Sequence, residues 1–269
     1  MHRPRYLPAQ VHVHVNETVR ERARVGLLEF ALLVTTFMLY FATRGVAAGK
    51  EAVAFGHAHT VMGLEQRLGL FREMGIQTVV LTVPAVTRLL NFVYAYTHLT
   101  ALILFGIWVF CWHHDAYRNV RNTFLVILFT GLAIYIIYPL APPRLFPYTG
   151  FVDTLKLYSG INYDQPSLAT LYNPFAAMPS LHVGFAVFVG MGLIRVGKRK
   201  LYWIPGIIFP LLMATAVVGT ANHYILDALA GTLLTVLAYI LVPRVSARLS
   251  AWYQVRHEDR TQTWAPTPF

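Results

Sequence analysis

Long apolar runs separated by short polar and basic segments dominate the chain. About 20 apolar residues suffice for a helix to cross the hydrocarbon core of a bilayer. Six runs approach or reach this length, at residues 25–43, 92–112, 120–140, 180–194, 202–219 and 223–242. The pattern predicts an all-α polytopic membrane protein. Residues 25–242 would form a domain of six transmembrane helices, between a basic arm at 1–24 and a basic, frayed tail at 243–269.

Two stretches in the N-terminal half need a different explanation. Residues 44–75 have apolar positions at helical intervals, but four charged residues there would be costly inside lipid: Glu65, Arg67, Arg72 and Glu73. This stretch therefore predicts an interfacial helix. Residues 76–112 are too long for one span and too short for two. We expect a short surface or re-entrant helix to about Leu90, followed by a span.

Prolines mark the end of the third predicted span. Pro139, Pro142 and Pro143 exclude further helix there, and a polar loop then runs over residues 145–178. Loops of this length in compact folds are usually functional. The sequence therefore predicts a long loop that contributes to a site.

The charges follow the predicted topology. The formal net charge is +10, from 22 Lys and Arg against 12 Asp and Glu. Six spans place both termini on one side, together with 15 of the 22 basic residues. The positive-inside rule then predicts a protein of the cytoplasmic membrane with both termini cytoplasmic and the long loop outside. Nucleic-acid binding is disfavoured because no basic patch is interleaved with exposed aromatics.

Polar residues gather at the predicted extracytoplasmic boundary. Arg144 follows the third span, and His223 and Asp227 open the sixth. The latter two share a helix face, so the carboxylate can hold one ring nitrogen and leave the other free as a nucleophile. Arg144 suits bidentate binding of phosphate oxygens. A His–Asp couple that only satisfies itself inside a helix bundle is the structural alternative.

A second histidine opens the fourth span. Pro179 or Ser180 would occupy the helix start, with His182 in the first turn beside N–H groups that suit a phosphate. His182 then fits a general acid that protonates a leaving oxygen. His98 lies within a span, where an ionisable residue is a functional candidate or a neutral His bonded to a neighbouring helix. Ser180 is also predicted to bind the substrate phosphate, and Asn173 and Asn222 are further candidates.

Three motifs resemble those of the phosphatidic acid phosphatase type 2 superfamily. They are Ala141–Arg144 (APPR), Met178–His182 (MPSLH) and His223–Asp227 (HYILD). The resemblance is closest to the branch that includes fungal inositol phosphorylceramide synthase catalytic subunits. It implies a six-helix membrane fold, a phosphohistidine intermediate on His223, Asp227 as orienting carboxylate, His182 as proton donor and Arg144 as phosphate binder.

The chain departs from the superfamily pattern at several positions. Ile137 stands where the first motif usually has Lys, Leu181 where the second has Gly, and Ala216 and Val217 where the third has Ser-Arg. Two cationic phosphate contacts are therefore missing. Either another base replaces them, or the ligand is a phosphodiester with less charge.

These features predict a metal-independent membrane phosphotransferase that needs no cofactor. It would transfer a phosphoinositol-type head group from a phospholipid, with an alcohol as a further candidate partner. One alternative is a lipid phosphate phosphatase acting on phosphatidic acid or a polyprenyl phosphate or diphosphate. A metalloenzyme using His182, His223 and Asp227, and a non-catalytic lipid transporter, are less favoured.

Overall fold

The computed structural model describes residues 49–160 and 173–262, with a discontinuous set of helical residues between 24 and 39. The chain divides into two units, 1–46 and 47–269. The predicted arm at 1–24 lies outside the described residues except for Arg24, as do 8 of the 19 residues of the first predicted span at 25–43. The arm and the first span stay predictions.

The described part of the second unit is helical, with one isolated parallel bridge between Leu140 and Ala176. The longer helices are α2 (Glu51–Leu68), α3 (Glu73–Leu81), α4 (Pro84–Phe92), α5 (His98–Trp112), α6 (His114–Ile137), α7 (Thr154–Ser159), α9 (Leu181–Gly197), α10 (Trp203–Gly219) and α11 (Ile225–Gln262). A π-helical turn, η1 (Val93–Thr97), joins α4 to α5, and short 3₁₀ turns form η2 (Pro143–Leu145), η3 (Pro147–Thr149) and η4 (Lys200–Tyr202).

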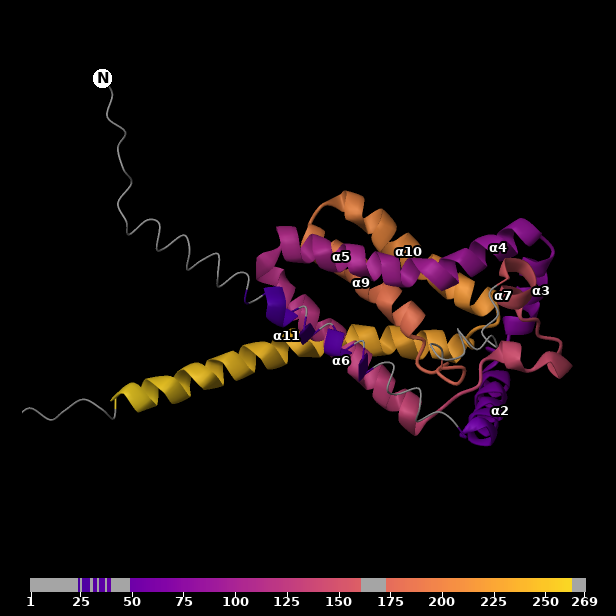
Figure 1. Cartoon of the computed structure of the whole chain (residues 1–269), viewed down its shortest axis with the longest axis horizontal. Coiled ribbons are helices and arrows are strands. Elements are labelled where there is room, and N and C mark those ends of the chain that lie inside the picture. The colour runs from indigo at the N-terminus through magenta and orange to yellow at the C-terminus, as the bar shows by residue number, and fades with distance from the viewer. Residues whose placement is uncertain are drawn as a thin grey trace, which may run out of the picture. The chain divides into compact units, whose positions relative to one another are not determined.

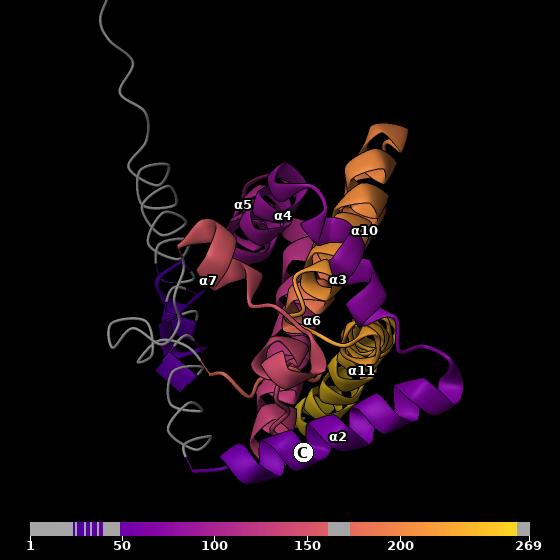
Figure 2. The same cartoon turned by 90° about the vertical axis from the view of Figure 1, so that its right-hand side faces the viewer.

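Helix α9 lies at the centre of the bundle and packs against α5, α6, α10 and α11 (Figure 1). Helix α2 runs across one end of this bundle rather than along it (Figure 2). One buried apolar cluster includes residues of α9 and α10, and a second joins α2 to the segments around residues 140–151 and 221–224. The second cluster underlies the end of the bundle where the candidate site lies.

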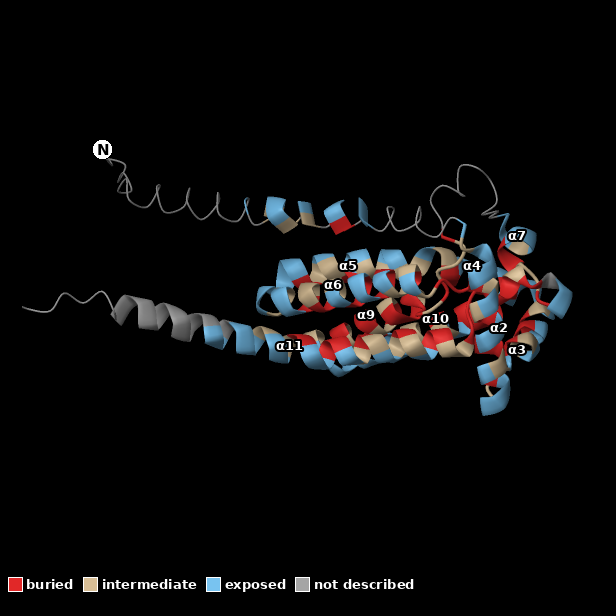
Figure 3. Cartoon of the chain, turned by 90° about the horizontal axis from the view of Figure 1, so that it is seen from below, coloured by how far each residue is buried: buried red, intermediate tan, exposed pale blue. Residues whose placement is uncertain are grey.

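The outer faces of the long helices are apolar and exposed, while their buried residues face inward (Figure 3). Large exposed side chains on α5, α10 and α11 include Leu99, Ile103, Leu104, Ile107, Ile204, Ile207, Ile208, Leu211, Leu229, Leu233, Leu237 and Leu241. A water-soluble monomer rarely exposes an apolar surface of this extent. These faces are suited to lipid.

Four helices in the described part of the chain are long and apolar enough to cross a membrane. They are Pro84–Trp112, His114–Ile137, Lys200–Gly219 and Ile225–Leu249. The fourth predicted span corresponds to α9, whose 17 residues make it a shorter apolar helix. The chain is therefore an all-helical membrane protein, and the count of six spans stays a prediction.

Three details of the sequence prediction are wrong. Residues 84–112 form one continuous helix, so no separate surface helix ends near Leu90. Pro84 begins this helix instead of interrupting it, because Pro at the first helical position loses no hydrogen bond. Helix α11 continues through Pro243 to Gln262, so the tail is not frayed from Pro243. The long loop also contains η3 and α7.

Candidate active site

Backbone hydrogen bonds join the three motif segments at one end of the bundle. The Arg144 amide donates to the Ala221 carbonyl at 2.9 Å, and the Ser180 amide donates to the Asp227 carbonyl at 2.9 Å. Leu140 and Ala177 complete the connection, since the Ala177 amide donates to the Leu140 carbonyl at 3.4 Å. Segments separated by more than 30 residues in the chain thus lie side by side, as their common membrane level predicts.

His223 is buried and oriented by two acceptors. Its Nδ1 atom lies 2.8 Å from the carbonyl oxygen of Ala177 and 3.4 Å from Oδ2 of Asp227. A carbonyl oxygen can only accept, so the Nδ1 atom must carry the proton in this contact. The lone pair of the neutral ring is then on Nε2, which is the arrangement that a nucleophilic histidine requires. The Ala177 carbonyl has no signature in the sequence, and the sequence analysis missed it.

Asp227 has a local role besides its contact with His223. The carboxyl group is fully buried, and its Oδ2 atom accepts a hydrogen bond from the Tyr224 amide at 2.9 Å. The carboxylate therefore caps the start of α11 while it faces the imidazole. This double use explains why a carboxylate four residues after His223 is well placed to fix the ring.

His182 lies in the first turn of α9. Ser180 is the N-cap of this helix, and its hydroxyl oxygen accepts from the Val183 amide at 3.4 Å. The centroids of the His182 and His223 rings are 5.6 Å apart. An imidazole from the first turn of α9 and an imidazole from the segment just before α11 therefore lie close together, as a nucleophile and a proton donor acting on one phosphoryl group must.

Two rings from the continuous 84–112 helix surround His182. Tyr94 stacks on it with centroids 4.4 Å apart, and the His98 centroid lies at 4.2 Å. The Nδ1 atom of His98 lies 3.1 Å from the carbonyl oxygen of Tyr94, its own helix neighbour. His98 therefore contacts His182, and its hydrogen bond goes to its own helix, not to a neighbouring helix as the alternative interpretation expected. Tyr94 lies in the π-helical turn, and π-turns are frequent at functional sites but leave no sequence pattern.

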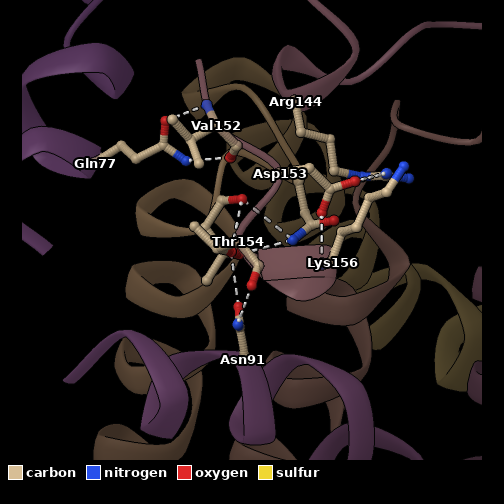
Figure 4. Close-up of polar contacts among 9 residues, drawn as sticks. Gln77, Asn91, Arg144, Val152, Asp153, Thr154 and Lys156 are labelled. Atoms are coloured by element: carbon tan, nitrogen blue, oxygen red, sulfur yellow. Dashed lines mark hydrogen bonds and ion pairs between the residues drawn. The ribbon is translucent and has the colours of Figure 1, made fainter. Parts of the chain in front are cut away.

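Arg144 enters the site from η2 with its side chain 4% exposed (Figure 4). One guanidinium nitrogen, Nη1, donates to Oδ2 of Asp153 at 3.0 Å. Asp153 also caps α7 by accepting the Lys156 amide at 3.1 Å. A phosphate held by Arg144 would share the guanidinium with the Asp153 carboxylate. The sequence did not predict this Arg144–Asp153 pair.

The segment that carries Asp153 is fixed to α3 and α4 by side-chain hydrogen bonds (Figure 4). Gln77 binds both backbone groups of Val152, at 2.8 Å and 3.0 Å. Asn91 donates to the Thr154 carbonyl and accepts from its hydroxyl, each at 2.8 Å. This part of the long loop is therefore a fixed wall beside Arg144.

The remaining predicted candidates have local partners. The Asn173 side chain accepts from the Phe175 amide at 3.0 Å, and the Asn222 side chain donates to the Thr220 hydroxyl at 2.8 Å. The Ser180 amide and hydroxyl oxygen are both in use as described above. These three residues shape the loops and the helix start, and their direct contact with a phosphate stays a prediction.

Close packing holds the start of α9 against its neighbours. A Cβ atom at Gly231 of α11 would collide with the carbonyl oxygen of Ser180, so only glycine permits this approach. The Leu181 side chain lies against Gly131 of α6, where an added Cβ would come within 2.7 Å of it. Leu181 is thus a packing residue in this chain.

Two glutamates behind the site were missed. The sequence analysis placed Glu65 and Glu73 at the membrane interface because of their charge, but both side chains are fully buried within the protein. Each accepts a hydrogen bond from the first turn of α11, at 2.7 Å and 2.9 Å respectively. Their helix periodicity was visible in the sequence, whereas their long-range partners were not.

Within the residues that the structure describes, no group of three or more His, Cys, Asp or Glu side chains could hold a metal ion. The set His182, His223 and Asp227, which composition alone would allow as ligands, does not form such a group.

The chain matches a known protein family over most of its length. The family model of the PAP2 superfamily matches residues 59–241. The chain belongs to the PAP2 superfamily. All three motifs of the candidate site lie within the matched region, as do Glu65 and Glu73.

One curated protein gives a more specific likeness. The chain is 31% identical over 155 residues to a phosphoinositol dihydroceramide synthase from Bacteroides thetaiotaomicron. The alignment covers 51% of this chain and spans about half of the relative, 50% of its length. No solved structure matches the chain. Together, these likenesses support a membrane enzyme of lipid phosphoryl transfer or phosphate hydrolysis, in a branch that resembles inositol phosphorylceramide synthases.

Proposed function

We propose that the chain is a phosphotransferase that moves a phosphoinositol-type head group from a phospholipid to a lipid alcohol. The observation that carries this proposal is the fixed tautomer of His223. Its Nδ1 proton faces the Ala177 carbonyl at 2.8 Å, which leaves the Nε2 lone pair for attack on phosphorus.

The reaction would proceed in two displacements. The Nε2 atom of His223 attacks the phosphodiester, and the bond from phosphorus to the glyceride oxygen breaks as His182 protonates that oxygen. The head group is then held on His223 by a P–N bond. The acceptor hydroxyl gives its proton to His182 and attacks phosphorus, and the P–N bond breaks. Both protons are accounted for, and the enzyme returns to its first state.

Charge around the phosphate supports a diester substrate. Arg144 is the family-motif cation that this chain retains. Of the positions where the superfamily usually has basic residues, Ile137 is 78% exposed on α6, and Val217 is fully buried in the apolar cluster of α9 and α10. Fewer cations suit the single charge of a phosphodiester better than the double charge of a monoester. The name of the bacterial relative agrees with this choice, since it pairs phosphoinositol with dihydroceramide.

The topology of the proposal follows the charge count. Helix α9 and the run at 25–43 would complete six spans with the four long apolar helices, and α2 would lie at the interface. Both termini would then be cytoplasmic and the site extracytoplasmic in the cytoplasmic membrane. No metal or cofactor takes part in this scheme.

The experiment is product analysis with purified protein. Phosphatidylinositol and phosphatidic acid are offered in mixed micelles, each with and without dihydroceramide, and products are identified by mass spectrometry. The proposal predicts an inositol phosphoryl sphingolipid and diacylglycerol in equal amounts. Release of inorganic phosphate from phosphatidic acid, with phosphatidylinositol inert, would favour the phosphatase alternative. Lipid movement across liposomes that survives loss of both histidines would favour a transporter.

A further inference from the structure

Three carboxyl groups meet the start of α11. Consecutive backbone amides of Tyr224, Ile225 and Leu226 donate to Asp227 Oδ2, Glu73 Oε1 and Glu65 Oε1, at 2.9, 2.9 and 2.7 Å. The first amides of a helix have no partner within the helix, so such acceptors stabilise it. Here the acceptors come from three elements, α2, α3 and α11 itself. The turn that carries His223 is therefore held from outside by α2 and α3.

The second oxygen of each glutamate is in an unusual position. Oε2 of Glu65 and Oε2 of Glu73 are buried, and neither receives a hydrogen bond from any N–H or O–H group in the described part of the chain. The Glu65 and Glu73 carboxyl groups accept from neighbouring amides and hydrogen-bond to each other, and the charge of Asp227 acts on Glu65. Two ionised carboxylates in contact without solvent repel each other strongly. One proton between the two Oε2 atoms removes this repulsion and satisfies both oxygens.

We propose that Glu65 and Glu73 share one proton and act as a positioning pair that fixes the start of α11, and with it His223 and Asp227. The proposal rests on the proposed function, because its kinetic consequence requires the His223 chemistry. The shared proton leaves the pair with one negative charge instead of two. Without this proton, the anionic phosphoryl group would have to approach three negative charges near the start of α11, those of Glu65, Glu73 and Asp227.

The titration of Glu65 agrees with this arrangement. Burial, the hydrogen bond with Glu73 and the charges of Glu73 and Asp227 together raise the pKa of Glu65 to about 9, against the hydrogen bond from the Leu226 amide, which lowers it. The pair should therefore keep its proton at neutral pH and lose it in mildly alkaline solution. Burial is the largest cause that raises the pKa of the Tyr224 phenol, and the charges of Asp227, Glu65 and Glu73 raise it as well. The phenol therefore stays neutral.

Substitution by glutamine distinguishes a pair that shares a proton from two carboxylates that only cap the helix. In Glu65→Gln, the amide oxygen can still accept from Leu226, and the amide nitrogen can donate to Glu73 as the shared proton does. Glu65→Ala removes both interactions. Activity of the full chain in detergent micelles is followed against pH for both variants. Glu51→Gln is the matched control, since Glu51 is exposed on the same helix.

A shared proton predicts that glutamine at position 65 preserves more activity than alanine does, and that it changes the pH dependence of kcat. At neutral pH, Glu65→Gln should exceed Glu65→Ala by about tenfold or more in kcat, since about 1.4 kcal/mol of positioning corresponds to that factor. The wild type and Glu51→Gln should lose more kcat than Glu65→Gln as pH rises through about 9, beyond the loss that all three share through deprotonation of His182. The same alkaline loss in Glu65→Gln, or equal activity of the Gln and Ala variants, would overturn the proposal.

A measurement without substrate keeps this test separate from the proposed function. The raised pKa means that the folded protein binds the Glu65 proton more tightly than the unfolded chain does. Its stabilising effect is complete at low pH and falls as pH rises toward about 9. The melting temperature of the wild type should therefore decline with pH relative to that of Glu65→Gln. Parallel curves would overturn the shared proton even if lipid transfer is found, and diverging curves would support it even if no tested lipid is turned over.

Discussion

The Nδ1 atom of His223 lies closer to the carbonyl oxygen of Ala177, at 2.8 Å, than to Oδ2 of Asp227, at 3.4 Å. A backbone carbonyl cannot change its protonation or rotate away independently of its peptide. The tautomer of His223 is therefore fixed even without a charge on Asp227. The Ala177 carbonyl thus orients the ring, and Asp227 supplies the negative charge beside it.

Asp227→Asn should consequently leave measurable activity. Asparagine can still accept from the Tyr224 amide, and the Ala177 carbonyl still orients the ring, so only the charge that stabilises a positive imidazole is lost. We expect kcat to fall by about 100-fold, less than the roughly 10⁴-fold loss known where the carboxylate alone sets the tautomer. Steady-state kinetics on purified protein measures this. A loss as complete as that in His223→Ala would show that the carbonyl contact does not hold the ring.

Arg144→Lys should weaken substrate binding. Lysine keeps the positive charge but lacks the planar fork that binds two phosphate oxygens and Asp153 together. We expect kcat/KM to fall by about 10- to 100-fold, with circular dichroism unchanged. Arg67→Lys is the control, because Arg67 is exposed on α2. Equal kinetics for the two variants would remove Arg144 from the site.

Gly231→Ala should disrupt the start of α9. The new methyl group would collide with the Ser180 carbonyl and push the His182 turn away from α11. Both the melting temperature and kcat are expected to fall. Gly106→Ala, in α5 where the space around the glycine is open, should leave activity intact and raise stability by up to about 1 kcal/mol. The prediction fails if the two variants melt alike.

Leu181→Ala should reduce stability more than it changes the reaction. Leu181 is 6% exposed and fills the space over Gly131, so its truncation leaves a cavity. A loss of about 2–3 kcal/mol is expected, seen as a lower melting temperature in detergent. The ratio of transfer to hydrolysis should stay as in the wild type. A shift toward hydrolysis with an unchanged melting temperature would instead show that Leu181 determines the preference for transfer over hydrolysis.

Much of the site could be predicted from the sequence because it rests on local patterns. Ser180 caps α9 with His182 in the first turn, as capping rules predict. Asp227 lies 3.4 Å from His223, but their predicted shared helix face is wrong, because His223 precedes α11, which begins at Ile225. The apolar runs likewise predicted long membrane helices, although Pro84 was taken for an interruption when it begins one.

The missed parts depend on contacts between distant segments. The Ala177 carbonyl acts through its backbone, so its side chain gives no signal. Glu65 and Glu73 are 161 and 152 positions from the amides they cap, and charge alone suggested an interfacial position for them. Tyr94 reaches His182 from a π-helical turn that periodicity does not reveal. Tertiary packing decided each of these roles.

The central claim is that His223 carries the phosphoryl group during turnover. Phosphatidylinositol labelled at phosphorus is mixed with the full chain, turnover is quenched with base to preserve the P–N bond, and labelled peptides are mapped by mass spectrometry. The account predicts transient label on His223 in the wild type and none in His223→Gln, while His182→Gln should form the label more slowly. Absence of label while product forms, or label that persists in His223→Gln, would contradict it.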